Sequence, residues 1–244
     1  MTRSTRPAFS RGACALAAAL TIAPLAPPAA AVGAAAQVSG GAATDAALGA
    51  YAALVRSPAA ATLLARARAA MERHWEPQDP GAAPDTARPI PWPGAAVAVY
   101  VSLVNGHATR ACVGREGACF ASLSEAVEVL AVEALASDRR RPPVRREELA
   151  GLRLVITFAG EGEPITDPML ADPGREGLSI STPGGFVGFL PGEARTVAWA
   201  LREARRIGVL AGPVSAASYR RFPVVVLSEP EVPASAREAL DEIR

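Results

Sequence analysis

Apolar and polar residues alternate on both sides of the dipeptide Asn105-Gly106, within the stretch 95–114. Such alternation is typical of β-strands, and Asn-Gly favours a two-residue hairpin turn whose central residues both take positive φ. A turn centred there predicts that Val101 lies opposite Arg110 and that Cys112 shares the face of Arg110, about 7 Å along the strand. The more apolar face, which we expect to be buried, holds Val97, Val99, Val101, Leu103, Ala108, Arg110 and Cys112.

Other parts of the chain carry the spacing of helices and further strands. Apolar residues at helical intervals, with capping signals at Ser57, Ser122 and Gly208, predict helices over residues 45–55, 57–75, 122–137, 191–207 and 234–243. Further strands are expected over residues 152–159, 178–182, 186–190 and 222–227. Together these elements indicate an α+β fold, with an antiparallel β-sheet that is built from hairpins and flanked by helices.

The first part of the chain, residues 1–36, has the pattern of a cleavable signal peptide rather than of a folded domain. Three arginines precede an apolar run at 13–26, and Ala-rich cleavage sites follow near Ala31 and Ala36. This pattern predicts a secreted or periplasmic protein; an Ala-rich tail is the alternative. Pro24 interrupts the apolar run, which is too short for a stable membrane span.

The patterns divide the chain into a signal peptide at 1–36, a linker with a short helix at 37–57, an α+β domain at 58–228 and a helical tail at 229–244. Half of all residues are apolar, which is enough for a substantial core. The formal net charge is +1, and this balance argues against a nucleic-acid partner. All 25 basic residues are arginine, which excludes Schiff-base chemistry.

Common catalytic motifs are missing from the sequence. It contains no Gly-x-Ser-x-Gly, no Cys-x-x-Cys and no His-Glu-x-x-His, and its histidines are His74 and His107. On the predicted register, His107 faces away from Cys112, so the two side chains do not converge on one metal ion. We therefore expect neither a metal nor a cofactor.

Arg110 and Cys112 have the clearest chemical interest. A guanidinium on a buried face needs a carboxylate or a cleft, and the candidate carboxylates are Glu116, Glu125 and Asp138. A thiol beside a fixed cation has a lowered pKa and becomes a better nucleophile or redox group. Two other roles stay open for Cys112: a small buried residue, or, in an oxidising compartment, a disulfide with Cys119.

Several motifs resemble one known family, in the same order along the chain. Residues 109–114, TRACVG, are similar to the LRGCIG hexapeptide of the AMMECR-one domain family, which also occurs in the bacterial and archaeal AmmeMemoRadiSam system. The stretch 61–75 resembles the opening helix of that family, and 137–144 resembles its SDPRFPPV motif. Residues 174–178 and 189–191 are similar to its GRHGL and LLP motifs.

The resemblance implies an antiparallel sheet with helices and a smaller subdomain, and it places the hexapeptide near an interdomain cleft. Cys112 is then the catalytic candidate, and the binding candidates are Thr109, Arg110, Ala111, Val113, Gly114, Asp138, Arg140, Pro142, Glu176, Leu190 and Pro191. The chain also departs from the family. Glu176 stands where the family commonly has His, and Gly192 where it often has Gln. Ala111 replaces the hexapeptide glycine, and Arg141 the usual Phe.

The reaction of that family is not established, so two hypotheses about function stay open. In the first, the chain is a ligand- or partner-binding module that uses the cleft at Arg110 and Cys112, with Arg110 in a buried ion pair. In the second, it is a thiol-dependent enzyme with Cys112 as nucleophile or redox group. The incomplete set of polar motif residues favours the binding module. Its partner is an unknown small molecule or a protein, and the resemblance implies a Memo-type protein as one candidate.

Overall fold

The computed structural model describes residues 48–76, 88–106, 108–138 and 141–230. The predicted signal peptide and the predicted helix at 234–243 lie outside the described residues. No single helix in the described ranges is long and apolar enough to cross a membrane. The helices Leu48–Val55 and Pro58–Arg73 reach that length and hydropathy only when they are counted together across their 84° bend.

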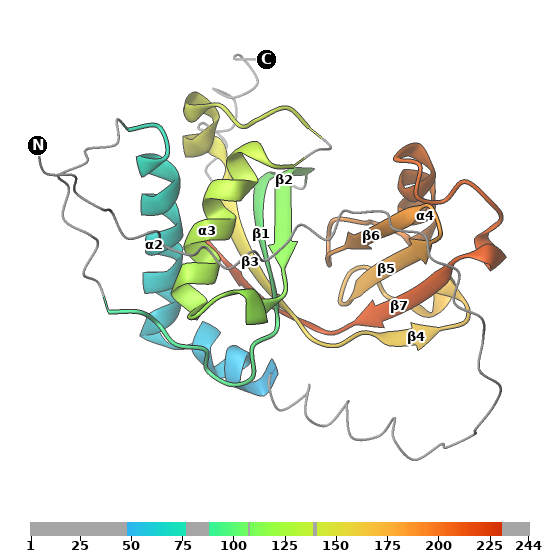
Figure 1. The fold of residues 1–244 in the computed structure, drawn as a ribbon, viewed down its shortest axis with the longest axis horizontal. Coiled ribbons are helices and arrows are strands. Elements are labelled where there is room, and N and C mark those ends of the chain that lie inside the picture. Colours follow the sequence, from blue (N-terminus) through green and yellow to red (C-terminus); the bar gives the residue numbers. More distant parts are fainter. Residues whose placement is uncertain (1–47, 77–87, 107, 139–140, 231–244) are drawn as a thin grey trace, which may run out of the picture. The chain divides into compact units, whose positions relative to one another are not determined.

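In the described residues, two antiparallel sheets of four strands each form the centre of the fold (Figure 1). Sheet A has the order β2-β1-β3-β8, and sheet B has the order β4-β7-β5-β6. The strands of sheet A are β1 Ala98–Asn105, β2 Ala108–Arg115, β3 Arg153–Ala159 and β8 Val224–Ser228. Those of sheet B are β4 Glu163–Ile165, β5 Gly177–Thr182, β6 Gly185–Phe189 and β7 Ser218–Phe222. The predicted α+β class is confirmed.

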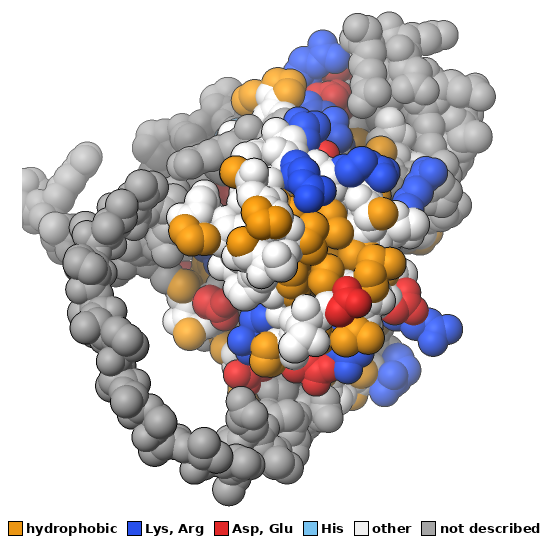
Figure 2. Space-filling view, turned by 90° about the vertical axis from the view of Figure 1, so that its right-hand side faces the viewer, with side chains coloured by type: hydrophobic (Ala, Val, Ile, Leu, Met, Phe, Trp, Pro, Cys, Tyr) orange, Lys and Arg blue, Asp and Glu red, His pale blue; other side chains and the backbone are white. Residues whose placement is uncertain are grey.

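Sheet B packs with helix α4, Val197–Arg206, around its own small core of buried residues. The predicted helix began at Pro191, and this start is wrong, because Pro191 and Ala194 form an isolated bridge in a turn. The N-cap is Thr196, whose side chain accepts a hydrogen bond from Trp199 N–H at 3.1 Å. Figure 2 views the side of the molecule that carries these elements, where arginine side chains gather above an exposed apolar patch.

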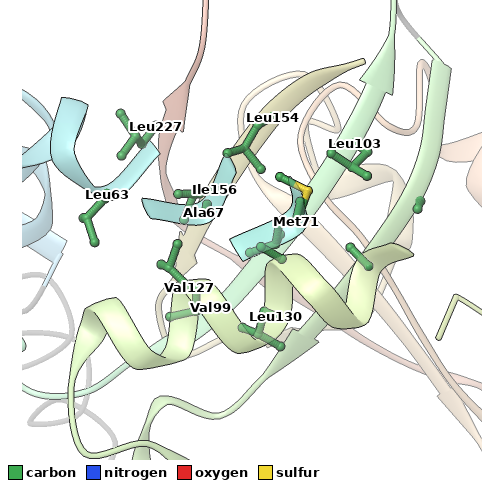
Figure 3. Close-up of a cluster of buried hydrophobic side chains, with 14 of the residues drawn as sticks. Leu63, Ala67, Met71, Val99, Leu103, Val127, Leu130, Leu154, Ile156 and Leu227 are labelled. Atoms are coloured by element: carbon green, nitrogen blue, oxygen red, sulfur yellow. The ribbon is translucent and has the colours of Figure 1, made fainter. Parts of the chain in front are cut away.

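Sheet A has the larger core, which lies between one of its faces and two helices, α2 Pro58–Arg73 and α3 Leu123–Ala136 (Figure 3). The predicted N-caps of both helices are confirmed: the Ser57 and Ser122 hydroxyls accept backbone N–H groups of their first turns. Side chains from both helices and from three strands meet in this core: Leu63, Ala67, Met71, Val99, Leu103, Val127, Leu130, Leu154, Ile156 and Leu227.

Four short 3₁₀ helices join the described elements: η1 Gly117–Cys119, η2 Arg146–Gly151, η3 Pro168–Leu170 and η4 Val214–Ala216. η2 follows α3 and precedes β3, in a region where the sequence pattern predicted neither a helix nor a strand. It carries Glu148.

The chain passes from one sheet to the other at two neighbouring points. β3 continues through Gly160–Gly162 into β4, and β7 continues through Pro223 into β8. The backbone N–H of Gly160 donates a 2.9 Å hydrogen bond to the carbonyl of Pro223, so the two crossings lie side by side. The predicted strand over 222–227 is confirmed from Val224 on, as β8, but its start is wrong. Phe222 belongs to β7, because Pro223 has no N–H for a sheet ladder and separates the two strands.

The register of the first hairpin also differs from the prediction. The prediction put both Asn105 and Gly106 in the turn. In the structure Asn105 pairs with Ala108 and is the last residue of β1, whereas Gly106, with φ 57°, lies in the turn. That pairing alone would set Cys112 opposite Val101, but the register shifts by one more residue between Leu103 and Val104. Cys112 therefore pairs with Ser102, and Val101 pairs with Val113. Because side chains alternate along a strand, this shift places Cys112 on the opposite face of sheet A from Val99, Val101 and Leu103.

Candidate functional site

A β-bulge in β2 determines where Arg110 points. Thr109 pairs with Val104 and Ala111 pairs with Leu103, which leaves Arg110 as the extra residue between two paired ones. A bulge of this kind re-aims a side chain without ending the sheet. Arg110 and Ala111 are both buried, Ala111 within the core under the helices. The predicted burial of Arg110 is confirmed, and the predicted shared face with Cys112 is wrong.

Arg110 is held by Glu148, a residue of η2. Its Nε donates to Oε1 of Glu148 at 3.0 Å, and its Nη2 donates to Oε2 at 2.9 Å. The carbonyls of Pro142 and Pro143 accept two more hydrogen bonds, at 3.0 and 3.1 Å. The carboxylates predicted for this pair, Glu116, Glu125 and Asp138, were therefore wrong, because only the fold brings η2 beside β2.

Glu148 remains a carboxylate in this setting. Burial by itself would raise the pKa of Glu148, but hydrogen bonds from Arg110 and from the backbone N–H of Arg145, with the charge of both arginines, hold it below its ordinary value. The pair is bidentate. The other contacts of Arg110 are backbone carbonyls, and Glu148 also accepts the backbone N–H of Arg145. This arrangement fixes β2 to the segment after α3, which is a structural role.

Cys112 lies in a different environment from Arg110. Its side chain packs in a small cluster with Tyr100 and Phe222, and its backbone N–H donates to a carboxylate oxygen of Asp138 at 3.0 Å. Cys112 carries a thiol, whereas Cys119 is disulfide-bonded. The predicted disulfide between these two residues is therefore wrong. β2 runs on for three residues after Cys112, about 10 Å of extended chain, before η1 begins.

Gly114 has a packing role that the sequence did not reveal. It stays within β2 opposite Tyr100, and a Cβ at this position would lie 2.1 Å from Cδ1 of the tyrosine ring. Only glycine lets the ring lie flat against the strand. Burial, with the charges of Cys112 and Glu116, raises the pKa of the Tyr100 phenol to about 12.

The other predicted site residues are spread over the structure. Val113 packs against the core of sheet A, and Pro142 contributes the carbonyl bound by Arg110. Glu176 accepts the backbone N–H of Asp172 at 2.8 Å and lies 3.9 Å from Arg221 Nη1. Arg140 lies outside the described residues. The fold therefore does not bring the motif residues together at a single point.

Thr109, Leu190 and Pro191 do meet, at a cavity of 240 Å³ on the face of sheet A that the helices leave open. The floor of this cavity includes side chains from all four strands, among them Ser102, Thr109, Thr157 and Ser228. Cys112 shares this face of the sheet but does not line the cavity.

A second cavity, of 570 Å³, shares Thr109 and Glu193 with the first, so the two adjoin. We call the two together the Thr109 cleft. The larger cavity is lined by three arginines, two glutamates and an indole: Arg141, Arg195, Arg206, Glu193, Glu203 and Trp199. Arg206 is paired with Glu203. Within the described ranges, Arg141 and Arg195 make no ion pair and no hydrogen bond through their side chains, and both are exposed.

No sequence signal connects Arg195 and Trp199 with the hexapeptide, which lies more than eighty residues earlier in the chain. In the sequence, Arg141 is a departure from a family motif and part of the basic run 139–141, for which an anion contact and a solvated helix end are alternative interpretations. Within the described ranges, no three His, Cys, Asp or Glu side chains are placed to hold a metal ion.

The fold and the motif residues define a domain with two antiparallel sheets, a bulged Arg-x-Cys strand and a cleft against a Leu-Pro turn. A sequence profile of the AMMECR1 family matches residues 64–212. The chain therefore belongs to the AMMECR1 family, which confirms the resemblance that the motifs suggested, and it carries an AMMECR1 domain of unknown activity.

Two further similarities were found. A protein of Aeropyrum pernix is 36% identical over 84 residues, which cover 32% of this chain and 36% of that protein. The match thus spans about a third of that relative. The crystal structure of the uncharacterized protein PH0010 from Pyrococcus horikoshii has a TM-score of 0.51 and 21% identity, and covers 70% of this chain and 91% of that one. This second similarity concerns the fold alone.

Proposed function

We propose that this protein is an exported binding module, and that the Thr109 cleft holds a small organic anion. The observation that carries the proposal is the pair Arg141 and Arg195, whose exposed guanidinium groups line a 570 Å³ cavity beside Trp199. A cavity of this size is typical of small-molecule sites. Arginine is well suited to carboxylates and phosphates, because its planar fork can donate two parallel hydrogen bonds.

The charges and the indole narrow the class of ligand. Among the described residues of the lining, three arginines against Glu193 and Glu203 give a formal charge of +1. Arg206 is already paired with Glu203, so Arg141 and Arg195 are the groups that would receive the anion. The indole of Trp199 offers an aromatic face beside them. An aromatic carboxylate or an aromatic phosphate ester satisfies both features.

A binding function is better supported than thiol catalysis. A reactive thiol needs a lowered pKa from a nearby cation or helix N-terminus, and it needs access to a substrate. Arg110, the cation that the sequence suggested, is bound to Glu148 on the other face of the sheet. Cys112 packs among Tyr100, Leu190 and Phe222. Among the residues that the structure describes, no nucleophile, base and orienting residue lie together in a catalytic arrangement.

The test is calorimetric titration of the purified protein with benzoate and phenyl phosphate, using benzyl alcohol as the uncharged control. Arg195→Gln should weaken anion binding by about tenfold or more, since it removes a charged hydrogen-bond donor. The matched control is Arg175→Gln, because that side chain is 90% exposed and lies outside the cleft. It should leave anion binding unchanged. Equal binding of benzyl alcohol, or no binding of either anion, would contradict the proposal.

A third variant distinguishes the two functional hypotheses. Cys112→Ala removes the thiol but leaves the lining of the Thr109 cleft intact. A binding module should keep its affinity for the anion within about twofold, which corresponds to less than about 0.5 kcal/mol. Loss of anion binding in Cys112→Ala, with the fold retained, would contradict the binding module and favour the thiol-dependent enzyme instead.

Export is proposed on the sequence pattern at residues 1–36, which lie outside the described part of the chain. N-terminal sequencing of protein recovered from the periplasm or the medium should find a start just after Ala31 or Ala36. A mature protein that begins at Met1 would overturn this part of the proposal. A protein partner of Memo type, which the family resemblance suggested, stays a prediction.

A further inference from the structure

A third cavity, of 540 Å³, lies where the chain passes between the two sheets. Both crossings contribute to it, through Gly160–Gly162 on one side and Phe222 on the other. The hydrogen bond between Gly160 N–H and the Pro223 carbonyl fixes these two segments against each other. None of the residues of this cavity lines the Thr109 cleft, so the two sites are separate. We call it the crossing cavity.

Three aromatic rings form part of its wall: Tyr100, Phe186 and Phe222. Two of these rings lie against glycines whose hydrogens leave room for them. A Cβ at Gly114 would lie 2.1 Å from Tyr100 Cδ1, and a Cβ at Gly177 would lie 2.0 Å from Phe222 Cε2. These contacts hold both rings in place. Phe186, in contrast, is 63% exposed, which is unusual for so large an apolar side chain.

The charged groups on the wall favour a cation. Glu116 and Glu161 are exposed carboxylates, and among the described residues of the lining Arg220 is the one basic side chain, which gives a formal charge of −1. Arg220 donates a hydrogen bond to the carbonyl of Gly162, so its guanidinium is held at the wall. The Tyr100 phenol keeps its proton at neutral pH, since burial and the neighbouring negative charges raise its pKa to about 12.

From this combination we infer that the crossing cavity is a binding site for a small organic cation, of the alkylammonium or quaternary ammonium class. Aromatic rings attract such cations through the negative faces of their π systems, and nearby carboxylates add direct charge attraction. The site is a second one, independent of the anion site proposed for the Thr109 cleft. The two carboxylates distinguish this cavity from a purely apolar pocket, and their negative charges would repel an anion.

The probe for this inference is choline, with 3,3-dimethylbutan-1-ol as a neutral molecule of the same shape. We expect choline to bind the full-length protein in a titration followed by NMR or calorimetry, and the alcohol to bind at least about tenfold more weakly. A peptide that carries trimethyllysine presents the same cationic group. Binding of choline alone would identify a free small molecule as the source, and preference for the peptide would identify a peptide-borne cation.

Two variants test the residues without threatening the fold. Phe186→Leu keeps an apolar side chain at an exposed position but removes the ring, and Glu116→Gln keeps size but removes charge. Each should weaken choline binding about three- to tenfold. The control for the loss of one negative charge is Glu72→Gln, since Glu72 is exposed on α2 and lies outside the cavity. It should leave choline binding unchanged.

The outcomes separate this inference from the proposal for the Thr109 cleft. Phe186→Leu and Glu116→Gln should leave benzoate binding intact, and Arg195→Gln should leave choline binding intact. Absence of choline binding, equal binding of the neutral alcohol, or binding that neither cavity variant weakens would each overturn the inference, whatever the result for the anion.

Discussion

Four hydrogen bonds hold the guanidinium of Arg110 between Glu148 and the carbonyls of Pro142 and Pro143. At the scale of single residues, this pair shows why an Arg-x-Cys sequence need not be a reactive site. The same arginine that would activate a thiol is directed away from it by one bulged position. The chemistry of the motif therefore depends on one backbone irregularity.

Arg110→Ala should lower the free energy of unfolding by about 3–5 kcal/mol, because it leaves the buried Glu148 carboxylate without its partner. Urea denaturation followed by circular dichroism measures this change. Arg175→Ala is the control, since that side chain is 90% exposed and its pairing with Asp172 should contribute less than about 1 kcal/mol. An Arg110→Ala protein as stable as the wild type would show that the ion pair is dispensable.

Gly114→Ala should destabilise the fold by about 1–3 kcal/mol, because the new methyl group collides with the Tyr100 ring. Gly212→Ala, where a Cβ meets nothing within 4 Å, serves as the control in the same thermal-melt experiment. The cost of Gly114→Ala should shrink in a Tyr100→Ala background, since the two residues are in contact. Strict additivity of the two changes would argue against the collision.

At the scale of elements, local signals determine where α2 and α3 begin, whereas tertiary contacts determine where α4 begins. The N-caps of α2 and α3 are local, and they form where Ser57 and Ser122 predicted them. In contrast, α4 does not begin at Pro191, where the sequence predicted its start. Pro191 is compatible with a helix start, but the turn at 191–194 is used to line the Thr109 cleft, and the helix begins after Thr196.

Thr196→Ala should therefore cost about 0.5–2 kcal/mol, because the hydroxyl accepts the Trp199 N–H at the first turn of α4. Thr166→Ala, at an exposed threonine between β4 and η3, is the matched control and should change stability by less than about 0.5 kcal/mol. Thermal unfolding of the two variants side by side provides the measurement. Equal melting temperatures for both would show that the Thr196 cap does not stabilise the fold.

At the scale of the whole molecule, the ion pair between β2 and η2 makes stability depend on pH. The pKa of Glu148 in the folded protein lies below the value of 4.5 expected for an ordinary glutamate. A group whose pKa is lowered by folding contributes its full stability above the unfolded pKa and loses it as pH falls through the folded pKa. The fold should therefore lose stability below about pH 4.5.

Urea unfolding at pH 7, 5, 4 and 3 measures this loss, with Glu148→Gln as the comparison. The variant lacks the titrating carboxylate, so its stability should change less over the acidic range, and the gap between the two proteins should narrow as pH falls. A gap that stays constant from pH 7 to pH 3 would mean that Glu148 does not titrate with unfolding.

Much of the fold could be predicted from the sequence because its signals are local. Helical spacing with a serine N-cap identifies α2 and α3, alternation around a glycine turn identifies two hairpins, and ordered motifs identify the family. The helix and hairpin signals depend on residues that are close together in the sequence, and each family motif is itself a short local stretch. The α+β class follows from such elements without knowledge of how they pack.

The sites depended on contacts that only the tertiary structure supplies. Arg110 and Glu148 are 38 residues apart, and nothing near either one in the sequence marks the other as its partner. The pairing Asn105↔Ala108 shifts the hairpin, and the bulge at Arg110 then separates it from Cys112. Because neighbouring side chains in a strand face opposite sides, so small a change of register exchanged the buried and the open face.

The sequence by itself thus determined the elements, the fold class and the family, since local spacing and capping encode them. The tertiary structure alone decided that Pro223 moves the chain between sheets, that Arg195 lies beside Thr109, and that aromatic rings meet two carboxylates at the crossings. The physical reason is that a cavity is made by side chains from strands and turns that are distant in sequence, and long-range packing fixes their relative positions.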